Sequence, residues 1–194
     1  MKRSWKLAAV GFTIAFLSFR ACSLSSLAID GVVLDESTKQ PIAGAIVVVT
    51  WMGDESKLVD SGSACYHAET ARTDTNGKWH TSAWSRPWST RNFGISLRNP
   101  VGEAYKSGYI SPPTFGPIET ILLTPHVGSK DKYFESLSTM IGRNWCNPYG
   151  ESGKNLMLFY KAIANETEII AETPKQVEIS RRFLLYYNEL IKNQ

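Results

Sequence analysis

A strand, turn and strand pattern in residues 29–50 constrains most strongly what this chain can fold into. Residues 29–34 are predicted as a first strand. Residues 35–41 follow as a polar turn, in which Pro41 fixes φ and offers no backbone N–H to a ladder. Residues 45–51 are almost continuously apolar and β-branched, which favours a central strand buried on both faces. The first half of the chain is therefore expected to be β.

A second turn signal, in residues 73–79, leads into another strand. Asp74 and Asn76 can accept hydrogen bonds in an Asx turn, and Gly77 can adopt a positive φ. Trp79 is then predicted to point inward from the strand that follows. This strand is predicted at residues 78–83, and further short strands are predicted at residues 93–97, 101–109 and 120–124.

Taken in order, these blocks resemble the carboxypeptidase regulatory-like domain, a small β-sandwich of transthyretin-like topology that many secreted and envelope proteins carry. The resemblance covers residues 29–125, about half of the 194 residues, and its individual motifs are short. Gly108 and Tyr109, for example, are similar to the Gly-Tyr that closes a late strand in that family. The resemblance implies a non-catalytic accessory module without the catalytic part of the peptidases.

After Pro125 the apolar residues recur at helical spacing. The predicted faces are Tyr133, Leu137, Met140 and Ile141, then Leu156, Phe159, Ile163, Glu166 and Ile170, and finally Val177, Phe183, Leu184, Tyr187 and Ile191. Thr173, Pro174 and Gln176 form a capping box with proline at the first helical position, so the third helix begins there. Three helices within residues 126–194 are too few for an independent domain, and we expect them to pack against the sandwich.

Residues 1–21 are typical of an export signal. A cationic start precedes an apolar run at residues 7–19, which is shorter than the roughly 20 residues that span a bilayer. Two processing routes remain open. Cleavage before Cys22 with acylation resembles a bacterial lipoprotein site and would tether the protein to the outer membrane, whereas cleavage after Ala28 would leave a soluble periplasmic or secreted protein.

The basic balance of the chain belongs to this leader. The formal net charge is +3, and four basic residues lie before Cys22. The exported part therefore lacks the excess of Lys and Arg that nucleic-acid binding requires, and we expect no nucleic-acid partner.

Either processing route leaves two thiols in the exported protein, Cys65 and Cys146. An oxidising compartment favours their pairing, so the sequence predicts a disulfide. Residues 52–64 are predicted as an inserted loop that delivers Cys65, and Cys146 lies between the first two predicted helices. The bridge would tie the helices to the sandwich.

Motifs for catalysis or for a cofactor are missing. His67, His80 and His126 show no spacing of a zinc peptidase. His67 and Glu69 match the His-x-Glu of zinc deaminases, but the Pro-Cys-x-x-Cys of that family is absent. The turn at residues 74–77 has Trp84 where an EF-hand has its twelfth-position Glu.

The transthyretin-related hydroxyisourate hydrolases share the topology but end in a Tyr-Arg-Gly-Ser-like tail, which this chain lacks. We therefore expect a protein without cofactor or enzymatic activity. A cryptic hydrolase with a site near His67, Glu69 and His80 remains the alternative.

Trp84, Arg86, Trp88 and Arg91 form the main aromatic concentration on a predicted loop. Exposed tryptophan beside arginine suits sugar stacking or a protein-binding hot spot. The alternative is that Trp84 and Trp88 cover the sandwich edge or the helices. The sequence is interpreted as an exported binding module of the cell envelope with a protein or glycan ligand. A structural accessory subunit of an envelope complex is the other non-enzymatic reading.

Overall fold

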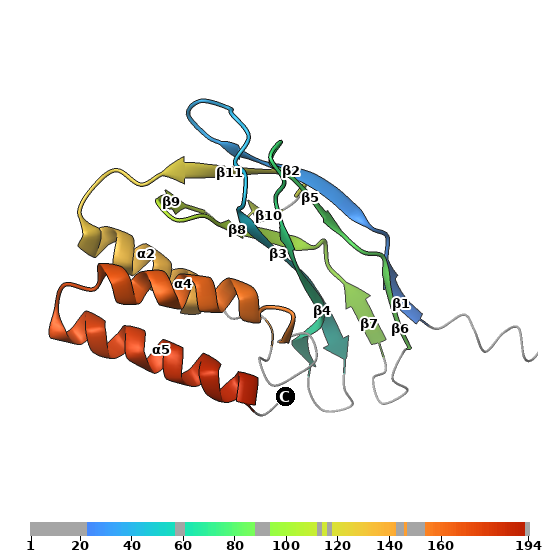
Figure 1. Ribbon diagram of the computed structural model, residues 1–194. Helices are drawn as coiled ribbons and strands as arrows, with labels where there is room; N and C mark the ends of the chain where they lie inside the picture. Colours follow the sequence, from blue (N-terminus) through green and yellow to red (C-terminus); the bar gives the residue numbers. More distant parts are fainter. Residues whose placement is uncertain are drawn as a thin grey trace, which may run out of the picture.

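The computed structural model describes residues 23–56, 61–87, 94–111, 114–115, 118–142, 146 and 154–192. Over these residues a mostly β region is followed by three helices that lie together on one side of it (Figure 1). The strands are β1 (Ser23–Ser26), β2 (Ile29–Asp35), β3 (Ile46–Ser56), β4 (Ser61–Arg72), β5 (Lys78–Thr81), β6 (Trp84–Pro87), β7 (Gly94–Leu97), β8 (Val101–Tyr105), β9 (Tyr109–Ile110), β10 (Thr114–Phe115) and β11 (Thr120–Pro125). The helices are α2 (Lys130–Gly142), α4 (Met157–Ile170) and α5 (Pro174–Lys192).

The strands form two larger sheets. One has the order β10-β8-β3-β4, and β7 pairs with the end of β3 that β8 does not reach. The other has the order β5-β2-β11-β9, in which β2 and β11 run parallel. Within the first sheet β4 is an edge strand, so one side of its backbone is not paired with another strand of that sheet.

Strand β3 separates two apolar cores, because its side chains alternate between the faces of the sheet. Val47, Val49 and Trp51 pack into the core shared with the second sheet, and Ile46, Val48 and Met52 pack into the core shared with the helices. The prediction of a central strand buried on both faces at residues 45–51 is confirmed. The helices form a further layer on that sheet, with α4 against β3 and α5 against α4 (Figure 1).

The capping box predicted for the third helix is present. The Thr173 hydroxyl accepts the Gln176 N–H at 3.2 Å, and the Gln176 side-chain oxygen accepts the Thr173 N–H at 3.0 Å. Gln176 also donates to Asp131 at 2.7 Å, which joins the start of α5 to α2. The three helices expected after Pro125 are confirmed.

Glu166 is the polar residue on the otherwise apolar face of α4, and it is fully engaged in hydrogen bonds. Its carboxylate accepts hydrogen bonds from the hydroxyls of Tyr105, Tyr133 (3.0 Å) and Ser107 (2.6 Å). Tyr133 in turn accepts the Gly108 N–H at 2.7 Å. One side chain therefore links α4 to α2, to β8 and to the turn after β8.

The prediction of an inserted loop at residues 52–64 was wrong. Strand β3 continues to Ser56, β4 begins at Ser61, and the two pair along their whole outer half. Gly53, Asp54 and Ser63 of this half belong to neither core, and its backbone pairs with β4 and β7 instead. A polar sequence therefore suffices there, and polar sequences are typical of loops. Cys65 lies within β4 as a result.

The loop predicted around residue 84 is also a strand. Trp84 pairs with Ser26 and Pro87 with Ser23, so β6 has β1 as its partner. The sequence did not predict β1 either. Trp88, Arg91 and Cys22 lie outside the described residues.

Candidate functional site

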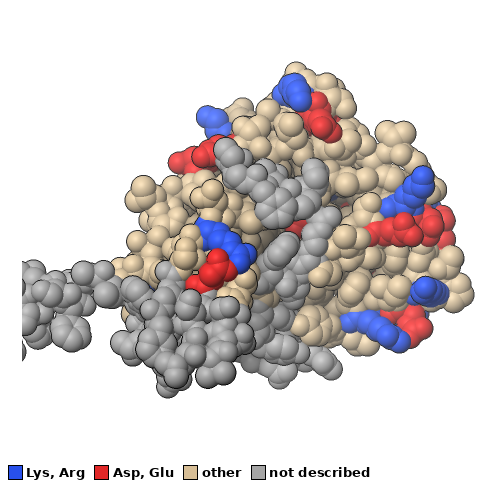
Figure 2. All heavy atoms as spheres, turned by 180° about the vertical axis from the view of Figure 1, so that it is seen from behind, with Lys and Arg blue, Asp and Glu red and all other residues tan. Residues whose placement is uncertain are grey.

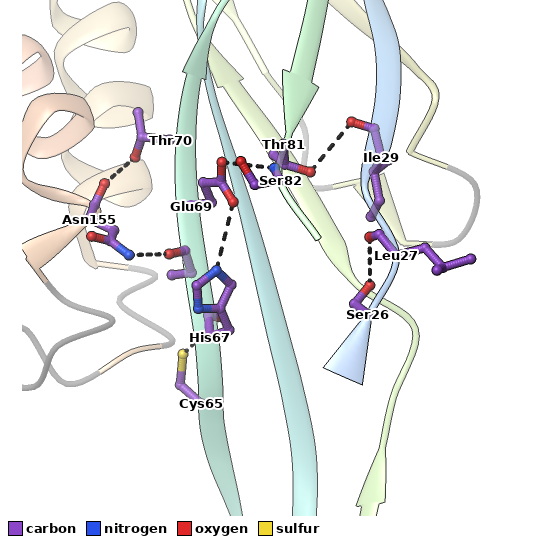
Figure 3. Close-up of polar contacts among 11 residues, drawn as sticks. Ser26, Leu27, Ile29, Cys65, His67, Glu69, Thr70, Thr81, Ser82 and Asn155 are labelled. Atoms are coloured by element: carbon purple, nitrogen blue, oxygen red, sulfur yellow. Dashed lines mark hydrogen bonds and ion pairs between the residues drawn. The ribbon is translucent and has the colours of Figure 1, made fainter. Parts of the chain in front are cut away.

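An open pocket of about 390 Å³ lies at edge strand β4. It collects side chains from β4, from the link between β5 and β6, and from the residue that precedes α4 by two positions. The lining residues are His67, Glu69, Thr70, Ser82, Ala83, Trp84 and Asn155. Figure 3 shows several of them around the β4 ribbon.

The imidazole of His67 forms an aromatic wall of the pocket together with Trp84. The two rings stack with centroids 4.8 Å apart. The ring centroid of the buried Trp51 lies 5.2 Å from that of His67. Trp51 is the cross-strand partner of His67, so the β3–β4 register places these two rings on the same face of the sheet. The wall is thus anchored in the core between the sheets.

Glu69 supplies the carboxylate of the pocket. It follows His67 by two residues and therefore points to the same face of β4. One carboxylate oxygen lies 3.7 Å from His67 Nε2, and the other accepts the Ser82 N–H at 3.0 Å (Figure 3). The side chain is one-quarter exposed, so the carboxylate is positioned by the protein and still reaches solvent.

Asn155 closes the pocket from the helical side. Its amide donates to the Ala68 carbonyl at 2.8 Å, and its own backbone carbonyl accepts the Thr70 hydroxyl. The side chain of Asn155 therefore occupies backbone hydrogen-bonding capacity at the open edge of β4, which an incoming strand would otherwise use.

A disulfide joins Cys65 to Cys146, with Cα atoms 5.1 Å apart, and confirms the predicted pairing. The register of β3 and β4 shifts between Trp51 and Met52, so Cys65 pairs with Met52 and packs against the core under the helices, whereas His67 pairs with Trp51, which belongs to the other core. The bridge therefore stands on the opposite face of β4 from His67 and Glu69. Cys146 is buried in the core between the sheet and the helices. The segment that ends at Asn155 is thus fastened to β4 by the bridge at one end and by hydrogen bonds at the other.

The structure brings together only part of the residues expected to form a site. Trp84 lines the pocket and is half-buried, so it covers the sheet edge and also faces the pocket. Arg86 is exposed and donates to the Tyr66 carbonyl at 3.2 Å. Trp88 and Arg91 lie outside the described residues.

The three histidines singled out in the sequence also lie in different surroundings. His67 and Glu69 lie in the pocket, whereas His80 does not line it and pairs with Asp30 at 2.8 Å on an exposed surface. His126 stacks on Tyr133 beside the start of α2. The structure therefore does not group His80 with His67 and Glu69, because His80 lies on the exposed face of β5, opposite the buried Trp79 and Thr81.

Sequence reasoning missed Thr70, Ser82 and Asn155 as pocket residues. They are small polar residues with no motif, and only the fold brings Asn155 to a strand more than eighty residues away. Among the described residues, no three His, Cys, Asp or Glu side chains come close enough together to hold a metal ion. Within the same residues, no helix has the length and apolar character needed to cross a membrane.

No protein-family model, curated protein or solved structure matches this chain.

Proposed function

We propose that this protein is an exported, non-catalytic binding module of the cell envelope that takes a glycan in the pocket at β4. The pocket combines an aromatic wall of His67 and Trp84 with the Glu69 carboxylate, and this observation carries the proposal. Sugars present apolar ring faces and hydroxyl donors together, and this pairing of surfaces suits both. The volume of about 390 Å³ lies within the range of small-molecule sites.

The surroundings of the pocket support this reading. The disulfide fits an oxidising compartment outside the cytoplasm. Over the described part of the face drawn in Figure 2, acidic groups lie beside the basic ones, so this face offers no broad field of one sign for a polyanion. A neutral ligand held by hydrogen bonds and ring stacking suits such a surface better.

The architecture proposed for the β region is a transthyretin-like sandwich similar to the carboxypeptidase regulatory-like domain. The shared core between the two sheets and the turn at Gly77 support it. Binding is favoured over hydrolysis because His80, one of the three groups of the hydrolase alternative, lies outside the pocket. The lipid-anchored and the soluble exported forms are both compatible with this function.

Titration of the oxidised protein with a panel of soluble neutral and acidic oligosaccharides tests the proposal. We expect saturable binding by calorimetry, with a change in tryptophan fluorescence from Trp84. Glu69→Gln keeps the shape of the side chain but removes its charge, and should weaken binding about 10- to 100-fold, as loss of a hydrogen bond to a charged group does.

Glu168→Gln, an exposed change on α4, is the matched control and should bind like the unchanged protein. Absence of binding to every member of the panel would overturn the proposal. Release of shortened sugars during the titration would overturn its non-catalytic part.

A further inference from the structure

Strands β1 and β6 continue the ladder of β2 and β5 in the same register. Ile29 pairs with Thr81 in the β2–β5 ladder. Three residues earlier on one strand and three later on the other, Ser26 pairs with Trp84. The two ladders are therefore one antiparallel pair with a short interruption, at residues 27–28 and 82–83.

The interruption lies at the pocket. Ser82 and Ala83 line the pocket, and Trp84, the next residue, begins β6 and stacks on His67. In the neighbouring strand Ser26 donates to the Leu27 carbonyl, and Thr81 donates to Ile29 across the ladder (Figure 3). Residues 23–28 thus form part of the framework that holds the β6 side of the pocket.

We propose that export removes only residues 1–21, so that the mature protein begins at Cys22 and keeps β1 as a structural strand. A leader is discarded before the mature protein acts and has no place in its hydrogen-bonded framework. Cleavage after Ala28 would delete every pair of the β1–β6 ladder and leave β6 without its partner. Of the two routes that the leader sequence offers, cleavage before Cys22 is the one that preserves the ladder.

The position of β1 also relates the mature N-terminus to the binding site. Ser23 pairs with Pro87 at the far end of the ladder, and Ser26 pairs with Trp84 at the pocket. Three residues of strand separate these positions, about 10 Å at the rise of an antiparallel strand. A mature chain that begins at Cys22 therefore carries its N-terminus close to the pocket without a linker between them.

The first test is the N-terminus of the exported protein. The full chain with a C-terminal tag is produced in a bacterial host, recovered from the envelope fraction and measured by intact mass and peptide mapping. A chain that begins at Cys22, with or without acyl groups, supports the proposal. A chain that begins at Ile29, or one that still begins at Met1, overturns it.

The second test asks whether the fold needs β1. Two oxidised forms, one beginning at Ser23 and one at Ile29, are compared by hydrogen exchange at the amides of residues 84–86. The shorter form should lose protection there by at least 10-fold, or fail to fold. Leu27→Ser in the longer form is the control, because Leu27 is 84% exposed and its change should leave the protection intact. Equal protection in the two forms would overturn the structural role of β1.

Discussion

Gly77 occupies a position at which any side chain would introduce strain. Its φ is 70°, in the left-handed region, and an added Cβ would lie 2.7 Å from the Val33 carbonyl oxygen. Asp74 accepts the N–H groups of Asn76 and Lys78 at 2.8 Å, which completes the turn. The turn therefore combines a conformational demand with a close approach between strands.

Three glycine substitutions separate these two effects. Gly77→Ala should lower the free energy of unfolding by on the order of 3 kcal/mol, because strain and overlap add. Gly108→Ala has a positive φ but open space, and should cost about 1–2 kcal/mol. Gly62→Ala has open space and no positive φ, and should change stability by less than about 0.5 kcal/mol.

Chemical denaturation of the three variants under oxidising conditions measures the series. Equal losses for Gly77→Ala and Gly108→Ala would contradict the close approach to Val33.

At the residue scale, the features that the sequence predicted correctly depend on neighbouring residues alone. Asp74, Asn76 and Gly77 belong to one turn, and their types alone indicate its geometry. The pocket is the opposite case, because Asn155 reaches β4 only through the packing of α4. Trp84 lines the pocket but lies in a strand and not in the predicted loop, since four residues with one tryptophan give no period that predicts a strand.

At the scale of elements, the disulfide has a narrower role than the sequence suggested. The helices also contact the sheet through an apolar core that includes Leu137, Phe159 and Ile163. We therefore expect packing to hold α2 and α4 against the sheet when the bridge is absent. What depends on the bridge is the segment before α4, which ends at Asn155 in the pocket wall.

Removal of the bridge should accordingly act on the pocket before it acts on the helices. In a Cys65→Ala, Cys146→Ala double variant, hydrogen exchange should accelerate first at residues 154–157, while α2 stays protected. Unfolding stability should fall by on the order of 4 kcal/mol in the chain-entropy account for a loop of this length. Reductant should change the unmodified protein and leave the double variant unaffected. Simultaneous loss of protection in α2 would show that the bridge holds the whole helical layer.

The strand elements also show where tertiary structure overrides local pattern. The outer halves of β3 and β4 contain Gly53, Asp54 and Ser63, which are poor strand formers in isolation. Their ladder is stabilised by β7 on the other side and by Arg98, which bonds to Asp54 and Ser63. These partners come from more than thirty residues away, so a reading of neighbouring residues predicts a loop.

At the scale of the whole molecule, tyrosines fill the contact between sheet and helices. Burial raises the pKa of Tyr105 well above its ordinary value of 10, and the Glu166 carboxylate raises it further. Burial raises the pKa of Tyr133 in the same way, with Glu166 again adding to it. The pKa values of Tyr160 and Tyr187 are raised mainly by burial.

These shifts predict a loss of stability at alkaline pH. The folded protein keeps these phenols neutral, whereas the unfolded chain ionises them near pH 10. The stabilisation is thus complete below pH 10 and is lost as the pH rises towards the folded pKa values. Denaturation at pH 8, 10 and 11, with tyrosinate absorbance followed in parallel, should show the free energy of unfolding falling above pH 10.

Tyr160→Phe removes one of the titrating groups and should reduce that slope by up to about 1.4 kcal/mol per pH unit. An unchanged slope would contradict the assignment of the alkaline effect to the tyrosines of this contact.

The helical periodicity after Pro125 was predicted because its faces are long and regular, and the helices pack where the sequence placed them. Strand β1 was not predicted, because Ser23–Ser26 forms a strand only against a partner some sixty residues later. Its alternating exposure follows from that pairing and not from an apolar period of its own.

Strand β3 contributes side chains to both cores. Neither the β region nor the helices could therefore be moved alone into another protein without exposing apolar surface. A sandwich transplanted without its helices would present Ile46, Val48 and Met52 to water. The helices alone would expose the apolar side chains that pack against β3, among them Phe159 and Ile163. We therefore expect the β region and the helices to occur together, and a relative that has lost the helices should carry polar side chains at these three positions of the strand.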